Sequence, residues 1–468
     1  MKIDRAEIER ILGQVTGADY VEGRYHSRIS RRFIVTEGEL ETAIATENSG
    51  IAIRALSGGV WGFSCTVSPS VKDIIEAAKR AVAMARVIPG RGSKDHISLA
   101  PAKLSVGEFC QKVTDPVSSH SDEEKINLVI DSEKVAKTSY DTIKSVSSFY
   151  SETTEKKIIV TTDGASCEIT TTKPEFIVSS IAKESGHTAS AFEGLGVMGG
   201  WKDLFKENTA AEIARKSASR AAALVNSRHP IGEKTVVILA PEIVGLMAHE
   251  AVGHLVEAEF VLSGSIMSSR LGSRVASNLV NLSDSGLSEI APNAAGTILV
   301  DDEGVRAAET KIIEDGILKS YLHNRETASL FNVSPTGNAR AYTYSDEPII
   351  RMRNTYFKPG DYSDEEIVSE VKHGYFLKGA LNGQADANGE FMFGFQECQL
   401  IKDGELGETM RGASVSGNLF ETLLSIDAIG KGFRYAIGTG YCGKWQPAKV
   451  DGGGPLIRCT ATVGGGGS

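Results

Sequence analysis

Two histidines and a glutamate stand close together in residues 241–260, PEIVGLMAHEAVGHLVEAEF. His249, Glu250 and His254 form the pattern HExxxH, one residue longer than the HExxH helix in which two imidazoles hold zinc and the glutamate handles a proton. In a regular α-helix, positions i and i+5 lie about 140° apart, so the two imidazoles would point in different directions. We therefore expect a single-turn π-bulge, with Gly253 beside it, to bring both imidazoles to one side.

The same three residues also have a purely structural explanation. Glu250 and His254 are spaced like a surface pair one helical turn apart, and His249 could be an ordinary core histidine. Only a further ligand elsewhere in the chain separates the two explanations, because a catalytic zinc site uses three protein ligands.

A candidate third ligand is Cys442, in the segment GTGYCG at 438–443. This segment formally matches the dinucleotide fingerprint GxGxxG, but that fingerprint needs a helix beginning at its third glycine, and residues 444–447, KWQP, do not predict one. The glycines instead predict a loop that approaches another part of the chain closely, with Cys442 at its tip. A thiolate there would complete a site with His249 and His254 and leave one position for water.

Several polar residues near these ligands have two possible roles. Glu257 and Glu259 closely follow His254, and they would either orient its imidazole or lie on a solvated helix face. Arg340 is a candidate clamp for a peptide carboxylate, with His323 and Arg325 nearby, although each of the three is more commonly a surface residue.

The candidate ligands must be positioned by the surrounding elements. Apolar residues at helical spacing predict helices at 1–20, 68–86, 121–140, 208–226 and near 363–372. Ser121 and Glu124 have the spacing of a capping box. Alternating and β-branched residues predict short strands at 20–29, 31–37, 39–47, 50–57, 142–149, 156–162, 167–172 and 175–183. Later β segments are predicted within 296–322, 390–402 and 455–463.

The chain of 468 residues is too long for one ordinary core, so we expect two domains. His229 and Pro230, with Gly232 close by, mark the predicted boundary. The expected fold is α+β, with an N-terminal sheet-and-helix domain at 1–230 and a mostly β C-terminal domain at 231–468 that carries the HExxxH helix.

Composition and charge argue against several classes of protein. The net charge is −10 and no basic block appears, which argues against nucleic-acid binding. The longest apolar run, residues 235–248, is far shorter than the roughly 20 residues that span a bilayer. The first residues, MKIDRAEIERILGQ, lack the apolar region of a secretory signal, and the six cysteines show no CxxC spacing. We therefore expect a cytoplasmic protein with reduced thiols and no membrane partner.

Several long segments carry a resemblance to a known family. They are GIAIRALSGGVWGF at 50–63, HEAVGHLVEAEF at 249–260, VDDEGV at 300–305, IEDGILKSYL at 313–322, PTGNAR at 335–340, NTYFKPG at 354–360 and GYCGKWQP at 440–447. With these segments the chain resembles the TldD/PmbA family of intracellular metallopeptidases over nearly its whole length. Within that family it is similar to the metal-binding, TldD-like subunit, because its HExxxH is intact.

The resemblance implies specific roles and partners. His249, His254 and Cys442 would bind one divalent metal, and Glu250 would be the catalytic glutamate. The soft thiolate favours Zn²⁺, with iron and cobalt left open. The resemblance also implies a two-subunit shell around the site, either a homodimer or a heterodimer with a TldE/PmbA-like paralogue.

The function expected from the sequence is a zinc-type metallopeptidase that hydrolyses unfolded peptides with little sequence specificity inside a dimeric shell. Pairing of the peptide main chain with a strand edge would explain such low specificity. One alternative is a metal-stabilised regulatory or scaffold protein without hydrolytic activity, in which Cys398, Cys459 or His323 closes the site as a fourth ligand. Another is an amidase that acts on non-peptide substrates.

Overall fold

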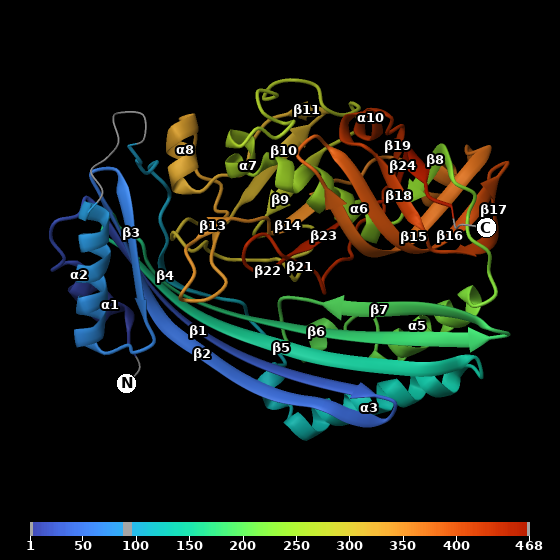
Figure 1. The fold of residues 1–468 in the computed structure, drawn as a ribbon, viewed down its shortest axis with the longest axis horizontal. Helices are drawn as coiled ribbons and strands as arrows, with labels where there is room; N and C mark the ends of the chain where they lie inside the picture. Colours follow the sequence, from blue (N-terminus) through green and yellow to red (C-terminus); the bar gives the residue numbers. More distant parts are fainter. Residues whose placement is uncertain (1–2, 88–95, 466–468) are drawn as a thin grey trace.

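The computed structural model describes residues 3–87 and 96–465, and a long curved sheet is its largest element (Figure 1). The strands follow the order β3-β2-β1-β5-β6-β4, with β7 beside β6. Their bounds are β1 Tyr20–Thr36, β2 Glu39–Ser57, β3 Val60–Thr66, β4 Val106–Cys110, β5 Ile143–Thr161, β6 Ser166–Glu184 and β7 His187–Gly196.

Four of these strands are much longer than the local patterns predict. The eight short segments expected in the first half form four continuous strands, β1, β2, β5 and β6. The predicted break near Asn48 and Gly50 was wrong, because Asn48 pairs with Arg28 and Gly50 pairs with His26 in one uninterrupted register. Pairing with a neighbouring strand holds such residues extended, and a local pattern does not record that pairing.

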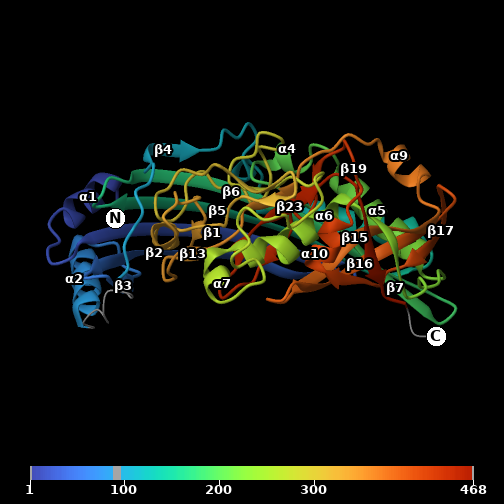
Figure 2. The same cartoon turned by 90° about the horizontal axis from the view of Figure 1, so that it is seen from above.

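Helices cover one face of this sheet. Their bounds are α1 Arg5–Leu12, α2 Val71–Val87, η1 Val117–Ser119, α3 Asp122–Ser139, α4 Trp201–Leu204 and α5 Ala210–Leu224. The predicted capping box is confirmed at the start of α3. The first helix is shorter than expected and ends at Leu12. Helices α1 and α2 pack at one end of the sheet, and α3 and α5 pack at the other (Figures 1 and 2).

Alternate residues of the long strands face two different layers, as the two-residue period of a strand requires. On β5, Tyr150 and Ile158 are buried against the helices. Lys157 points the other way and contacts Asp302 in the second half of the chain. The second half therefore packs against the face of the sheet that the helices leave uncovered.

Two further sheets build the second half. One has the order β15-β8-β24-β18-β16-β17, with β19 beside β24, and the other has the order β11-β10-β9-β14-β23-β20. The first contains β8 Glu233–Leu239, β15 His373–Ala385, β16 Glu390–Lys402, β17 Glu405–Arg411, β18 Ser414–Asn418, β19 Ala428–Ile429 and β24 Ile457–Val463. The second contains β9 Leu282–Ser285, β10 Glu309–Glu314, β11 Ile317–Leu318, β14 Asn354–Phe357, β20 Arg434–Tyr435 and β23 Asp451–Gly454.

Short elements complete this half. Two small pairs are formed by β12 Ala339–Arg340 with β13 Ile349–Ile350, and by β21 Tyr441–Cys442 with β22 Ala448–Lys449. The helices are α6 Pro241–Leu246, η2 Met247–Gly253, η3 His254–Val256, α7 Ala258–Leu262, α8 Arg325–Phe331, α9 Asp364–Ser369 and α10 Leu419–Leu424.

The largest apolar core surrounds the helical segment 241–256. Val244 and Val252 of this segment are fully buried with Phe357 of one sheet and Leu377 of the other. Each such side chain contributes about 1.5–3 kcal/mol of burial free energy, so the core fixes the segment that carries both histidines.

The chain thus has an α+β fold, with the longer helices in its first half and a strand-rich second half. The strands up to β7, which ends at Gly196, belong to the long sheet, and the strands from β8, which begins at Glu233, belong to the other sheets. This change of sheet supports our proposal of a domain boundary near residue 230. Among residues 3–87 and 96–465, no helix combines the length and the apolar character that crossing a membrane requires.

Candidate metal centre

The segment that carries the two histidines is a helix that changes its winding. Helix α6 begins at Pro241, whose fixed φ suits the first helical position. It continues as the π-helix η2, Met247–Gly253, and then as the 3₁₀ turn η3. The N–H of His254 donates to the carbonyl oxygen of His249, five residues earlier. The predicted π-bulge is confirmed, and the two imidazoles meet edge to face with 5.1 Å between ring centroids.

Glycine at position 253 is required by close packing at the end of the π-helix. A Cβ there would lie 1.9 Å from Sδ of Met352 and 3.1 Å from the carbonyl oxygen of Ala248. Met352 is itself fully buried in the core, so it has little freedom to move away.

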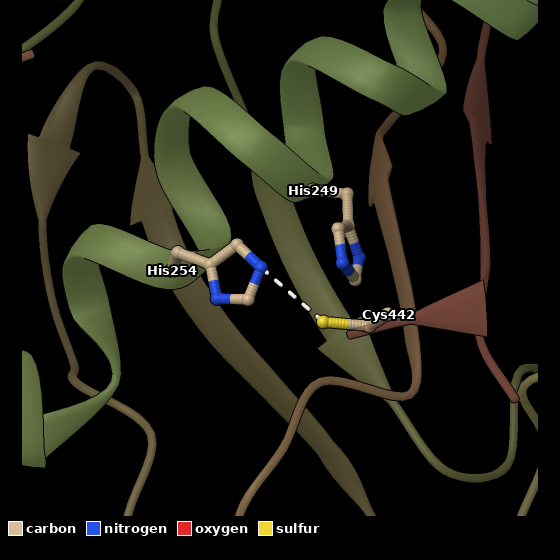
Figure 3. A group of neighbouring side chains, drawn as sticks. All are labelled: His249, His254 and Cys442. Atoms are coloured by element: carbon tan, nitrogen blue, oxygen red, sulfur yellow. Dashed lines mark hydrogen bonds between the residues drawn. The ribbon is translucent and has the colours of Figure 1, made fainter. Parts of the chain in front are cut away.

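The third candidate ligand comes from the hairpin β21–β22. Sγ of Cys442 lies 3.3 Å from Nε2 of His254, and ligand atoms of Cys442, His254 and His249 all lie within 4.8 Å of one another (Figure 3). The next element after Gly443 is strand β22, so the prediction that no helix begins there is confirmed. The segment GTGYCG therefore lacks the helix that a dinucleotide fingerprint needs. Arg351 fixes the hairpin by donating to the carbonyl oxygen of Cys442 at 2.7 Å.

Without a metal ion, the cluster contains a Cys442 thiolate beside a His254 imidazolium. Burial raises the pKa of the Cys442 thiol, but the neighbouring imidazoles of His249 and His254 outweigh burial and lower that pKa to about 3. Burial lowers the pKa of His254, but its contacts with Cys442 and Glu257 outweigh this and raise that pKa to about 10. Because a thiolate is the ligand form of cysteine, the cluster can exchange the imidazolium proton for a metal ion.

The residues present fit a metal ion of the zinc type. His249 is only 2% exposed, and neither of its ring nitrogens has a hydrogen-bond partner within residues 3–87 and 96–465. Buried polar atoms normally have a partner, and a cation between the three donors would provide one. Two imidazole nitrogens and one thiolate form a donor set that suits zinc.

A buried ion pair supports His254 from behind. Nδ1 of His254 lies 3.2 Å from Oε2 of Glu257, which leaves Nε2 directed at Cys442. The ammonium of Lys444 donates to Glu257 at 2.9 Å and to Glu259 at 2.7 Å. The expectation for Glu257 as an orienting residue is therefore confirmed, whereas Glu259 contacts Lys444 and not His254.

Glu250 lies between the cluster of candidate ligands and an open cleft. Its Oε2 lies 3.7 Å from Nε2 of His254, and its side chain is 24% exposed. Together with His249 and Cys442 it lines a cleft of about 1650 Å³. The cleft lies between β7 and α5 of the first half and α6, β15 and β20 of the second. Glu250 can therefore meet both a bound metal and a substrate in the cleft.

The other candidate residues are used elsewhere. Arg340 does not line the cleft beside the cluster and donates to the main-chain carbonyl groups of Met352 and Lys449, so the role of a clamp for a peptide carboxylate in that cleft is not supported. His323 and Arg325 are 2% and 3% exposed, so they are not the surface residues that their types predict.

The fourth ligand that the scaffold alternative requires is not found. In the described part of the chain, the group of donors contains His249, His254 and Cys442, and it includes none of Cys398, Cys459 and His323.

Sequence reasoning missed Lys444, which holds the acidic pair behind His254. A signal was present, because a single basic residue follows Cys442 by two positions while two acidic residues follow His254 closely. Their pairing becomes visible only when the hairpin is placed beside the helix.

Comparison with known sequences gives matches along the chain. The profiles described as PmbA/TldA metallopeptidase domain 1, central domain and C-terminal domain match residues 21–85, 115–225 and 232–465. A metalloprotease from Methanothermobacter thermautotrophicus is 33% identical over 470 residues, which cover 99% of this chain and 100% of the relative. A zinc metalloprotease TldD homolog from Saccharolobus solfataricus is 32% identical over 457 residues, which cover 94% of this chain and 95% of the relative.

Solved structures share the fold at lower identity. A putative modulator of a DNA gyrase from Thermotoga maritima superposes with a TM-score of 0.79 at 20% identity, over 98% of this chain and 99% of that one. TldE from Thermococcus kodakarensis superposes with a TM-score of 0.78 at 17% identity, over 99% of this chain and 100% of that one.

Proposed function

The chain belongs to the PmbA/TldD family of metallopeptidases, and on that premise we propose that it is a zinc-dependent peptidase that cleaves unfolded peptides. The observation that carries the proposal is the convergence of His249, His254 and Cys442 beside Glu250, at the wall of a large cleft. Within residues 3–87 and 96–465 the buried ring of His249 has no hydrogen-bond partner, and a cation bound at one of its nitrogens would supply one.

Each residue of the cluster has a role in this proposal. His249, His254 and Cys442 hold one divalent metal, which as zinc would polarise both a water molecule and the scissile carbonyl. Glu250 accepts the proton of the attacking water and returns it to the leaving amine. Glu257 holds the Nδ1 side of His254 and so keeps the lone pair of Nε2 available.

The cleft supports an extended peptide as the substrate. Strand β20, which lines the cleft, is the edge strand of its sheet. An edge strand can pair with the main chain of a peptide, and such pairing reads little of its sequence. Low sequence specificity and a preference for unfolded chains follow from this mode of binding.

A two-subunit shell around the cleft completes the proposal. The second subunit is either another copy of this chain or a TldE-like paralogue, and TldE from Thermococcus kodakarensis supports the latter by its shared fold. Native mass measurement of the purified chain distinguishes the two, since a heterodimer predicts a monomer when the chain is alone. We also propose the cytoplasm as its compartment, because all six cysteines are free.

The proposal is tested with zinc-loaded protein and a disordered peptide. Glu250→Gln should lower the rate of cleavage by about 10²–10⁴-fold, because it removes the general base. Zinc content should stay equal to that of the wild type. Glu405→Gln, which changes an exposed carboxylate elsewhere on the cleft wall, should cleave normally.

Two outcomes would contradict this proposal. Equal cleavage by wild type and Glu250→Gln would remove the glutamate from the mechanism. No cleavage by fully zinc-loaded wild type would favour the scaffold protein, unless a panel of small amides is hydrolysed, which would favour the amidase.

A further inference from the structure

A second, smaller cavity lies where the long sheet meets the hairpin β21–β22. Its volume is about 60 Å³, several times the ~10–15 Å³ that one water molecule needs. Residues of β1, β5 and β6 line one side, and segments around Val300, Tyr342 and Ala448 line the other. None of the three candidate metal ligands lines this cavity. It is therefore separate from the metal centre.

Basic side chains dominate the lining of this cavity. Two carboxylates, Glu155 and Asp302, line it together with six cations, which are Arg28, Lys157, Lys173, Arg340, Arg351 and Lys449. Asp302 is paired with Lys157 at 2.8 Å, and Lys449 is paired with Glu175 at 2.6 Å. Glu155 is also engaged, at 3.0 Å from His26. The carboxylates of the cavity are thus already in use.

Four of the cations, Arg28, Lys173, Arg340 and Arg351, have no carboxylate in contact within residues 3–87 and 96–465, and Arg28 lies over the ring of Tyr342. The guanidinium groups of Arg340 and Arg351 donate to main-chain carbonyl groups. The buried Nε of Arg351 has no hydrogen-bond partner among the described residues. Lys173 is only 8% exposed, and its ammonium forms no ion pair with the described chain.

Unpaired buried cations are strongly unfavourable unless something neutralises them. Burial, together with Arg340, lowers the pKa of Lys173 well below its usual value. Burial, together with Arg351, lowers the pKa of Arg340 to about 10. Both pKa values are lowered in part because these cations repel one another across a confined space. An anion bound between them would raise both pKa values again.

We propose that this cavity binds a small tetrahedral oxyanion such as sulfate or phosphate. Such an anion accepts several charge-assisted hydrogen bonds at once, and Lys173, Arg340 and Arg351 supply donors for them. A cavity with several unpaired basic groups, whose own carboxylates are already paired, favours a doubly charged anion over chloride or a single carboxylate.

The position of the cavity gives the anion a structural effect. Lys173 lies on β6 of the first half, whereas Arg340 and Arg351 donate to carbonyl groups of Lys449 and Cys442 at the two strands of the hairpin. A bound oxyanion joins the long sheet to this hairpin and stabilises their contact.

Sulfate titration of the purified full-length chain, with and without zinc, tests the proposal. Ionic strength is held constant with chloride, and calorimetry and the thermal midpoint are both recorded. We expect one sulfate per chain and a saturable rise of the midpoint. Lys173→Met should weaken sulfate binding by about tenfold or more, because it removes one charged donor. Lys156→Met is the matched control, since Lys156 is partly exposed, is paired with Glu168 and does not line the cavity.

Several results would overturn the proposal. One is that sulfate affects the wild type no more than chloride does. The others are that Lys173→Met binds sulfate as tightly as the wild type does, and that acetate binds more tightly than sulfate. If Lys173→Met does not fold, crystals of the wild type grown in selenate show whether the cavity binds an oxyanion. An anomalous peak in the cavity supports the site, and peaks only elsewhere refute it.

Discussion

At the residue scale, His249 and His254 approach the proposed metal from different environments. His249 is 2% exposed and has no side-chain hydrogen bond to the part of the chain that the structure describes, whereas the side chain of His254 is 20% exposed and is held by Glu257. A metal ion would therefore give one ring nitrogen of His249 a partner, and it would replace the proton on Nε2 of His254. Without Glu257, His254 could turn its ring and lose the alignment with Cys442.

The first prediction concerns the charge of Cys442 in metal-free protein. Because its pKa is lowered to about 3, the thiol should be ionised at every pH above that value. The thiolate absorbance in the ultraviolet, taken as a difference from Cys442→Ser, should stay constant from about pH 8 down to about pH 5. Loss of this absorbance with a midpoint near the ordinary value of about 8.5 would contradict the geometry of the cluster.

The second prediction concerns Lys444 as a positioning residue. Its side chain is 4% exposed, and Lys444→Met leaves the fully buried Glu257 without its cation. Zinc affinity should fall by about 10–100-fold, as expected when a group that orients a metal ligand is disturbed. Competition with a zinc chelator measures this, and Lys79→Met, an exposed lysine, is the control. Unchanged zinc affinity in Lys444→Met would show that the ion pair only stabilises the fold.

At the element scale, the π-helix η2 is the device that aligns the two imidazoles. Its winding depends on the absence of a side chain at Gly253, where the helix touches Met352. Insertion of a methyl group into a packed core costs about 1–3 kcal/mol through forced shifts.

The third prediction follows from this contact. Gly253→Ala should lower the free energy of unfolding by about 1–3 kcal/mol and should also weaken zinc binding, because the shift displaces His254. Denaturant unfolding and zinc competition measure the two effects. Gly432→Ala is the matched control, since nothing lies within 4 Å of the Cβ that it adds. If both variants bind zinc like the wild type, the packing at Gly253 does not set the alignment.

The sequence was informative where a feature is local. The i,i+5 spacing of His249 and His254 predicted the π-bulge, and the spacing of Ser121 and Glu124 predicted a capping box. The glycine-flanked Cys442 was correctly expected near both histidines, although its role as a ligand stays a proposal.

Features that depend on distant partners were missed. Local patterns divided β2 near Asn48, because the pairing that holds that residue extended comes from another strand. The contacts of Lys444 and Arg340 were not predicted, because they form only when the hairpin meets the helix and the segment around residue 350.

At the scale of the whole molecule, buried charges join the two halves. Arg54 of β2 pairs with Glu22 of β1 and with Glu303 of the second half, each at 2.9 Å, and all three side chains are at most 5% exposed. Replacement of one member of such a cluster leaves uncompensated charge in the interior.

The fourth prediction is that Arg54→Met lowers the free energy of unfolding by about 3–5 kcal/mol at neutral pH. Burial raises the pKa of Glu303 and Arg54 opposes that rise, so in the folded state Glu303 takes up a proton more readily in Arg54→Met than in the wild type. The deficit of Arg54→Met should therefore shrink as the pH falls toward about 5. Denaturant unfolding at both pH values measures this.

The control for this cluster is Arg228→Met, which breaks an exposed pair with Glu408. It should change stability by less than about 0.5 kcal/mol. A similar loss in both variants would mean that the buried cluster does not carry the contact between the halves.

X-ray absorption at the zinc edge of the loaded protein tests the central claim most directly, because it reports the atoms around the metal. We predict one zinc per chain with two nitrogen neighbours at about 2.0–2.1 Å and one sulfur neighbour at about 2.3 Å, and loss of the sulfur in Cys442→Ser. A zinc spectrum without sulfur, or one that Cys442→Ser leaves unchanged, would contradict the assignment of His249, His254 and Cys442 as the metal ligands.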